Sequence, residues 1–288
     1  MIKFLKSVVN FSLVLLTWMT INFIFNYYQL NRPVKIDADT LIIGDSHLRF
    51  GLDPELIPSS ENVCIGAEPL LITHYKLKRI LSDNPDIKTV LLGYSYNNFS
   101  AYQDEKLYGN RAKSQYNKYY SVLPLSLPNY THLNEVKFYH TYVEKMLLYP
   151  NFKPWPFMGE HDKMKPNLEN ANLDAIMKRH YYIDDEVADI STISGQYLDS
   201  IISLTLDRKV KLFLISTPLR PEYIENTPDH IVNYWDEKTM DLRDKGVNIL
   251  DYSKLDYPAD HFHDHDHLSI IGTEKFSKEV LEKIASVN

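Results

Sequence analysis

Two short stretches of this chain carry side chains that could act together in nucleophilic catalysis. One is Gly-Asp-Ser-His at 44–47, directly after an apolar run, and the other is HFHDHDHLS at 261–269. A serine hydroxyl needs a base to accept its proton, and the base needs a carboxylate that orients it. In the spacing Asp-x-x-His, the carboxylate can turn back onto the imidazole within one turn. The two stretches therefore predict Ser46 as nucleophile, His267 as base and Asp264 as its orienting acid.

The histidine-rich stretch also allows a metal site as an alternative. Its four histidines stand at alternate positions, so on an extended strand they would lie on one face. However, two residues of the stretch already have roles in the serine site, and no other cluster of carboxylates and histidines completes a metal site. The single Cys64 excludes a multi-cysteine zinc site. We therefore expect no metal and no cofactor, and a solvated or pocket-lining role for the other three histidines.

The serine and the histidine can meet only if the fold brings the two ends of the chain together. After residue 40, short apolar runs alternate with longer helical patterns. The predicted strands are 40–44, 62–66, 88–95, 210–217 and 247–253, and the predicted helices are 68–81, 184–208, 227–246 (capped by Thr227) and 269–285. This alternation is typical of βαβ units and predicts a doubly wound parallel sheet. Ser46 would lie beyond the carboxyl end of a strand, where such sheets bind ligands.

One segment interrupts the alternation. Residues from about 100 to 180 contain six prolines, many tyrosines and few periodic runs. We expect an insertion or cap over the sheet, partly helical around 132–148. Its aromatic content is too high for a disordered linker.

The first thirty residues differ in composition from the rest. No charged residue lies between Lys6 and Arg32, and 7–25 has the length of about 20 residues that a helix needs to cross hydrocarbon. A cleaved signal peptide, the main alternative, would need small residues before the cut, and none follow Phe25 closely. A buried soluble helix is the other alternative. We predict an uncleaved anchor at 1–30, a cytoplasmic N-terminus and an extracytoplasmic body at 31–288.

Composition narrows the kinds of partner. The chain has 288 residues, of which 44% are hydrophobic, enough for one large domain or two small ones. Its net charge of −7 provides no basic face for a duplex phosphate backbone. We therefore expect no nucleic acid partner.

The two motifs resemble the first and last blocks of the SGNH/GDSL hydrolase superfamily. The resemblance rests on GDSH after the first predicted strand and on DHDHLSIIG before the last predicted helix, and it covers about residues 40–285. It implies a flavodoxin-like three-layer α/β fold and ester hydrolysis or acyl transfer. It also implies the same triad, with Ser46, His267 and Asp264 in the roles given above.

The resemblance further implies an oxyanion hole, and here the sequence departs from the family pattern. The N–H groups of Ser46 and Gly66 match two of the donors. In LLGYSYNNFS, however, Ser95 stands where the family has an asparagine. Asn97 and Asn98 follow two and three residues later, and we expect one of them, with Asn97 favoured, to supply the third donor instead. Loss of one such donor costs roughly 10²–10³ in rate, so a catalytically inactive binding or assembly component is the alternative function.

The predicted anchor narrows the resemblance further. The chain is similar to extracytoplasmic SGNH-like proteins of alginate O-acetylation and of teichoic acid D-alanylation. That similarity implies an acyl-ester or glycopolymer substrate of the cell envelope, and a membrane-bound acyltransferase is a candidate partner. His47 beside the nucleophile and Arg220 after a predicted strand are the candidate substrate-binding residues. The alternative for His47 is a position on the helix surface, and the alternative for Arg220 is a surface salt bridge.

Overall fold

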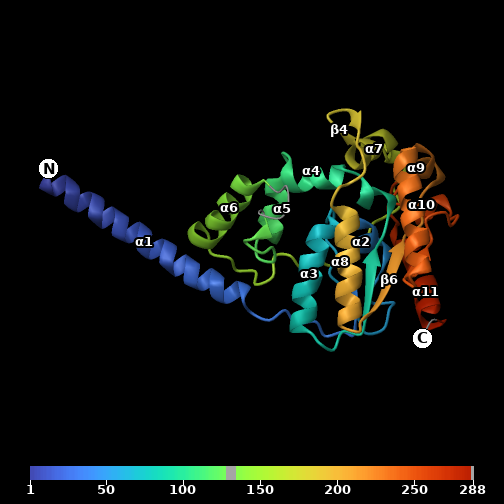
Figure 1. Ribbon diagram of the computed structural model, residues 1–288, viewed down its shortest axis with the longest axis horizontal. Coiled ribbons are helices and arrows are strands. Elements are labelled where there is room, and N and C mark those ends of the chain that lie inside the picture. Colours follow the sequence, from blue (N-terminus) through green and yellow to red (C-terminus); the bar gives the residue numbers. More distant parts are fainter. Residues whose placement is uncertain (128–133, 287–288) are drawn as a thin grey trace. The chain divides into compact units, whose positions relative to one another are not determined.

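The computed structural model describes residues 1–127 and 134–286 (Figure 1). Its contacts divide the chain into two compact units. Unit 1 consists of Met1–Val34 and Leu107–Phe157, and unit 2 consists of Lys35–Lys106 and Met158–Asn288. Unit 1 therefore joins the predicted anchor to the middle of the predicted insertion, whereas unit 2 holds the residues of the predicted serine site.

Five parallel strands form the main sheet of unit 2, in the order β2-β1-β3-β6-β7. They are β1 (Thr40–Ile43), β2 (Ser60–Asn62), β3 (Thr89–Gly93), β6 (Lys211–Ser216) and β7 (Asn248–Asp251). Numbered along the chain within this sheet, the order is 2-1-3-4-5, which is that of flavodoxin-like doubly wound folds. Ile42, Leu91 and Phe213 in the central strands are fully buried, as expected of a parallel sheet covered on both faces. The predicted fold class is confirmed.

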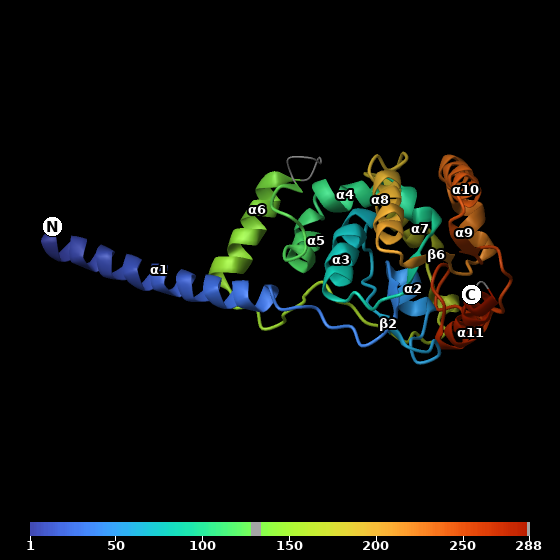
Figure 2. The same cartoon turned by 60° about the horizontal axis from the view of Figure 1, so that its bottom comes forward.

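Helices cover both faces of this sheet (Figure 2). One face carries α3 (Leu70–Asp83), α8 (Ser194–Asp207) and α10 (Asp229–Asp244), and the other carries α2 (Ser46–Gly51) and α11 (Ile270–Ser286). Leu48 of α2 and Phe276 of α11 pack with Phe213 in one hydrophobic core. Phe262 and Leu268, which flank the predicted base and acid, belong to the same core. This core fixes the histidine-rich stretch beside α2.

Three predicted boundaries are wrong. Residues 184–193 are not helical, because Asp184 and Asp185 have positive φ (50° and 65°) and turn the chain between β4 (Tyr182–Ile183) and β5 (Glu186–Val187). Thr227 does not cap α10, because its hydroxyl donates to the Tyr223 carbonyl of α9 (Pro221–Asn226). The strand predicted at 62–66 is β2, which ends at Asn62, although the following residues continue hydrogen bonding beside β1.

Unit 1 is built around α1 (Ile2–Leu30), which is long and apolar enough to cross a membrane. The chain enters the second part of the unit through α4 (Tyr102–Tyr108). There follow α5 (Ala112–Tyr119), α6 (Glu135–Val143) and the π-helical turn η3 (Glu144–Leu148). The helix predicted around 132–148 corresponds to α6 and η3, and residues 132–133 lie outside the described residues. Phe138 of α6 packs edge-on against Tyr116 of α5, with ring centroids 5.3 Å apart.

Candidate active site

Ser46 is the first residue of α2, immediately beyond the carboxyl end of β1. The turn that leads to it requires glycine, because Gly44 has φ +145° and a Cβ there would lie 3.0 Å from the backbone nitrogen of Gly93 on β3. Asp45 caps α2, since its carboxylate accepts the N–H of His47 at 3.0 Å. Asp45 is thus a structural residue at the start of α2, and Ser46 is left half-buried at the end of the sheet.

The histidine-rich stretch forms a closed loop against the first turn of α11. A bridge pairs Phe262 with Leu268 across the base of the loop. Gly272 allows the close approach of the helix, because a Cβ there would meet the carbonyl oxygen of His261 at 2.1 Å. The bridge between Phe262 and Leu268 closes the loop, and α11 packs closely against His261 at its start. In this position Asp264 and His267 face Ser46.

Ser46, His267 and Asp264 form a continuous hydrogen-bonded chain. The Nε2 atom of His267 lies 2.8 Å from Ser46 Oγ. On the other side of the ring, Nδ1 lies 3.1 and 3.0 Å from the two carboxylate oxygens of Asp264. The Oδ1 atom of Asp264 also accepts the backbone N–H groups of Asp266 and His267, at 3.1 and 2.8 Å. These contacts fix the orientation of the carboxylate and of the imidazole, as a nucleophile, base and orienting acid require.

The predicted second oxyanion donor lies beside the serine. A Cβ built on Gly66 would be 3.9 Å from Ser46 Cβ, and among the described residues no oxygen accepts the N–H of Gly66. The loop that carries Gly66 is anchored by Lys76, which is fully buried, pairs with Glu68 at 2.9 Å and also donates to the Val63 carbonyl. The structure therefore brings Gly66 and Ser46 together.

The predicted third donor contacts the capping residue instead of the serine. The side-chain amide of Asn97 donates to Asp45 Oδ2 at 3.4 Å, and that of Asn98 donates to the same oxygen at 3.1 Å. Ser95, at the position where the related family has asparagine, lies 3.2 Å from His47 Nδ1 through its hydroxyl. A serine–histidine pair thus fills this part of the site, and a role of Asn97 in an oxyanion hole stays a prediction.

Behind His267 lies a second carboxylate that the sequence did not reveal. Asp266 is fully buried, and its Oδ1 lies 3.5 Å from His267 Nδ1. Its Oδ2 lies 3.5 Å from His47 Nε2 and 3.7 Å from His180 Nε2. Three imidazoles therefore surround one carboxylate, all slightly beyond hydrogen-bond distance. His180 is fixed in turn by a 2.8 Å hydrogen bond between its Nδ1 and the Tyr223 hydroxyl.

Electrostatics distinguishes these histidines. Burial lowers the pKa of His267, but the negative charges of Asp266 and Asp264 outweigh burial and raise that pKa to about 9. Burial lowers the pKa of His180 to about 3, against the opposing charge of Asp266. Although burial alone would raise the pKa of Asp266, the surrounding imidazoles hold it well below its usual range. His267 is thus the protonated partner of a buried carboxylate in the resting site at neutral pH, and His180 is neutral.

Within 1–127 and 134–286, the same cluster contains the atoms that come closest to a metal site. One ligand atom each from His47, Asp266 and His267 lie within 4.8 Å of one another. Both ring nitrogens of His267 already face Asp264 and Ser46, which leaves two free groups, fewer than the three or four protein ligands of ordinary zinc sites. The alternating histidines do not converge either, since His261 faces Asp260 and His263 faces the Lys165 carbonyl.

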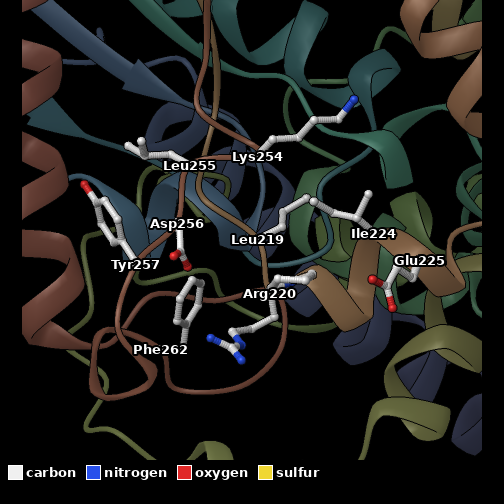
Figure 3. Close-up of a pocket in the computed structure, with 10 residues that line it drawn as sticks. Leu219, Arg220, Ile224, Glu225, Lys254, Leu255, Asp256, Tyr257 and Phe262 are labelled. Atoms are coloured by element: carbon white, nitrogen blue, oxygen red, sulfur yellow. The ribbon is translucent and has the colours of Figure 1, made fainter.

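The two candidate substrate-binding residues lie in different surroundings. His47 is buried between Ser95, Thr217 and Asp266, so the alternative of a helix-surface position is wrong. Arg220 pairs with Glu222 at 3.1 Å and lies over the ring of Phe262, which is the predicted ion-pair alternative. It also lines a pocket of about 260 Å³ together with Leu219, Ile224, Tyr257 and Phe262 (Figure 3). Substrate binding by either residue stays a prediction.

Comparisons with known proteins give matches among solved structures alone. No protein-family model and no curated protein matches the chain. A GDSL-like lipase from Bacteroides thetaiotaomicron is 12% identical, with a TM-score of 0.38 over 94% of this chain and 96% of that one. The aryl esterase of M. smegmatis is 11% identical, with a TM-score of 0.43 over 87% and 100%. An acetylxylan esterase from Geobacillus stearothermophilus is 12% identical, with a TM-score of 0.42 over 88% and 96%.

Proposed function

We propose that this protein is a serine-dependent acyl-ester hydrolase or O-acyltransferase. The single observation that carries the proposal is the chain from Ser46 Oγ through both nitrogens of His267 to Asp264. An aligned hydroxyl, imidazole and carboxylate is the arrangement that activates a serine for attack on an acyl carbonyl.

The residues have defined tasks in this reaction. His267 in its neutral form takes the proton of Ser46 as Oγ attacks the acyl carbonyl, and the N–H groups of Ser46 and Gly66 stabilise the oxyanion. His267 then gives the proton to the departing alkoxide oxygen, which leaves an acyl group on Ser46. Water or a sugar hydroxyl attacks this ester next, and His267 accepts and returns the proton once more. Hydrolysis and transfer therefore differ only in the acceptor.

The proposed substrate is an acylated glycopolymer or acyl ester of the cell envelope. Its support is α1, which is long and apolar enough to anchor the protein in a membrane. With the N-terminus in the cytoplasm and the body outside it, the site would meet surface polymers, and a membrane-bound acyltransferase would be a fitting acyl donor or partner. A non-catalytic binding or assembly component is the second candidate, favoured by Ser95 in place of asparagine and by the contact between Asn97 and Asp45.

Ester hydrolysis by the full chain in detergent tests the proposal. We expect turnover of a chromogenic acetyl or short-acyl ester and covalent labelling by a fluorophosphonate probe. Ser46→Ala should abolish labelling and lower kcat by about 10⁴ or more. Ser82→Ala, which alters an exposed serine on α3, should leave both unchanged. Folded wild-type protein that neither turns over ester nor reacts with the probe would support the binding component instead.

A further inference from the structure

The two units differ sharply in charge. Unit 1 contains nine lysine and arginine residues and two glutamates, a net charge of +7, whereas unit 2 contains 22 basic and 36 acidic residues, a net charge of −14. The net charge of −7 for the whole chain is therefore the sum of a basic unit 1 and a more strongly acidic unit 2. Basic residues next to a membrane-spanning segment are attracted to anionic lipid headgroups.

The C-terminal part of α1 is built into the fold of unit 1. The side-chain amide of Asn26 donates to the carbonyls of Lys145, Met146 and Tyr149, at 2.8 to 3.0 Å. Its oxygen accepts the N–H of Asn151 at 2.6 Å. These buried or partly buried backbone groups would lose their partner if α1 were removed, which favours a retained helix over a cleaved signal peptide.

The hydrogen bonds between α1 and η3 also define which part of α1 lies beside η3. This part begins near Trp18, whose indole N–H donates to the Leu148 carbonyl at 3.4 Å, and includes the buried Asn22. Residues before Trp18 are exposed along their whole length. Among the described residues, the part of α1 without protein contacts is therefore its N-terminal part, and η3 lies beside the C-terminal end of the apolar stretch 7–25, where the helix would emerge from the bilayer.

An apolar stripe is exposed on the helix that leads into this contact. Val136, Tyr139 and Val143 are exposed on α6 at spacings of three and four residues, so they share one face. Val136 is 80% exposed, and Phe152, which follows η3, is 76% exposed. Phe138 on another face of α6 packs against α5. In both views α5 lies on one side of α6 and the N-terminal part of α1 extends on the other (Figures 1 and 2).

We propose that the stripe of Val136, Tyr139 and Val143 on α6, together with the exposed Phe152 beyond η3, inserts into the interface of an anionic bilayer. The stripe and the emerging end of α1 belong to one unit, so anchoring α1 brings the stripe to the headgroup level. Amphipathic helices with basic neighbours bind such interfaces through apolar burial and electrostatic attraction. Lys137, Lys145 and Lys153 provide the basic neighbours. This inference concerns unit 1 and holds whether or not Ser46 is catalytic.

Depth-dependent fluorescence quenching on the full chain tests the inference. Single cysteines replace Val136 or Phe152, and Leu206→Cys, at a 75% exposed position on α8 of unit 2, is the matched control. Native Cys64 is fully buried, and the unsubstituted chain gives its background labelling. Each variant carries an environment-sensitive NBD label and is reconstituted in vesicles of phosphatidylcholine and phosphatidylglycerol, with or without doxyl-labelled lipid. Flotation and a thermal melt establish insertion and folding.

We expect a blue-shifted emission at positions 136 and 152 and several-fold quenching by doxyl lipid, with neither effect at 206. Replacing the anionic lipid with phosphatidylcholine should weaken the quenching at 136. Water-like emission at both test positions in floated, folded protein would overturn the inference, and the face would then be one for a protein partner. Equal quenching at 206 would overturn it as well, because it would indicate unspecific adsorption. Neither result depends on ester turnover.

Discussion

On the base side of the candidate site, one short loop supplies both the imidazole and the carboxylate. Asp264 and His267 are three residues apart and are joined by backbone and side-chain hydrogen bonds. On the oxyanion side, by contrast, the groups around Ser46 come from the loop after β2, the turn after β3 and α2. A local motif fixes the first geometry, whereas the second depends on how three segments pack.

The largest effect that we expect within this comparison is on the base side. Asp264→Asn should lower kcat/KM for a short-acyl ester by about 10⁴. An asparagine amide can donate toward Nδ1 and thereby favour the tautomer with its proton on Nε2, which cannot accept the proton of Ser46. Steady-state kinetics of the two proteins at one pH measure the loss.

Asp260→Asn is the matched control, because Asp260 is an exposed carboxylate that faces His261 in the same loop. It should change kcat/KM little. If Asp266→Asn abolished activity while Asp264→Asn retained it, Asp266 would be the orienting acid. The base side would then depend on tertiary packing as well as on the local motif.

This difference explains what could be predicted from the sequence. The pairing of Asp264 with His267 could be predicted because it depends on local spacing, and the doubly wound sheet because it depends on apolar periodicity. The contact of His267 with Ser46 requires that sheet, since the two residues are 221 positions apart. The contact of Asp266 with His180 could not be predicted, because His180 lies in the last turn of α7 (Leu173–Tyr181), 86 positions before Asp266, and meets it only through tertiary packing. The helix predicted over 184–193 is wrong because Asp184 and Asp185 adopt positive φ angles in a turn between β4 and β5. The apolar pattern of the sequence does not indicate this turn.

On the oxyanion side we expect a smaller effect. If Asn97 supplies the third donor, Asn97→Ala should lower kcat by roughly 10²–10³ with little change in KM, because such a donor acts on the transition state. Asn98→Ala is the matched control, since Asn98 donates to the same oxygen of Asp45. A similar loss of kcat in both variants would contradict the donor role and show that both amides act by holding Asp45.

We expect the smallest effect on activity from a change at Asp266. This carboxylate contacts His267 on the base side and His47 on the oxyanion side. The pKa of His267 is raised to about 9 in the folded protein, so the neutral base forms, and kcat/KM rises, as the pH approaches that value. Asp266→Asn removes a negative charge 3.5 Å from Nδ1 and should lower this pKa. The rising limb should therefore move to lower pH, by about 1–3 units, while Asp260→Asn leaves it in place.

Stability provides an independent readout of the same charge. Because the folded pKa of His267 exceeds the unfolded value of about 6.5, protonation of His267 stabilises the fold fully below pH 6.5. That contribution is lost as the pH rises through about 9. The free energy of unfolding, followed by urea denaturation across this range, should fall less in Asp266→Asn than in the wild type. An unshifted rate profile together with an unchanged pH dependence of unfolding would show that Asp266 does not act on His267, and the base side would then depend on Asp264 alone.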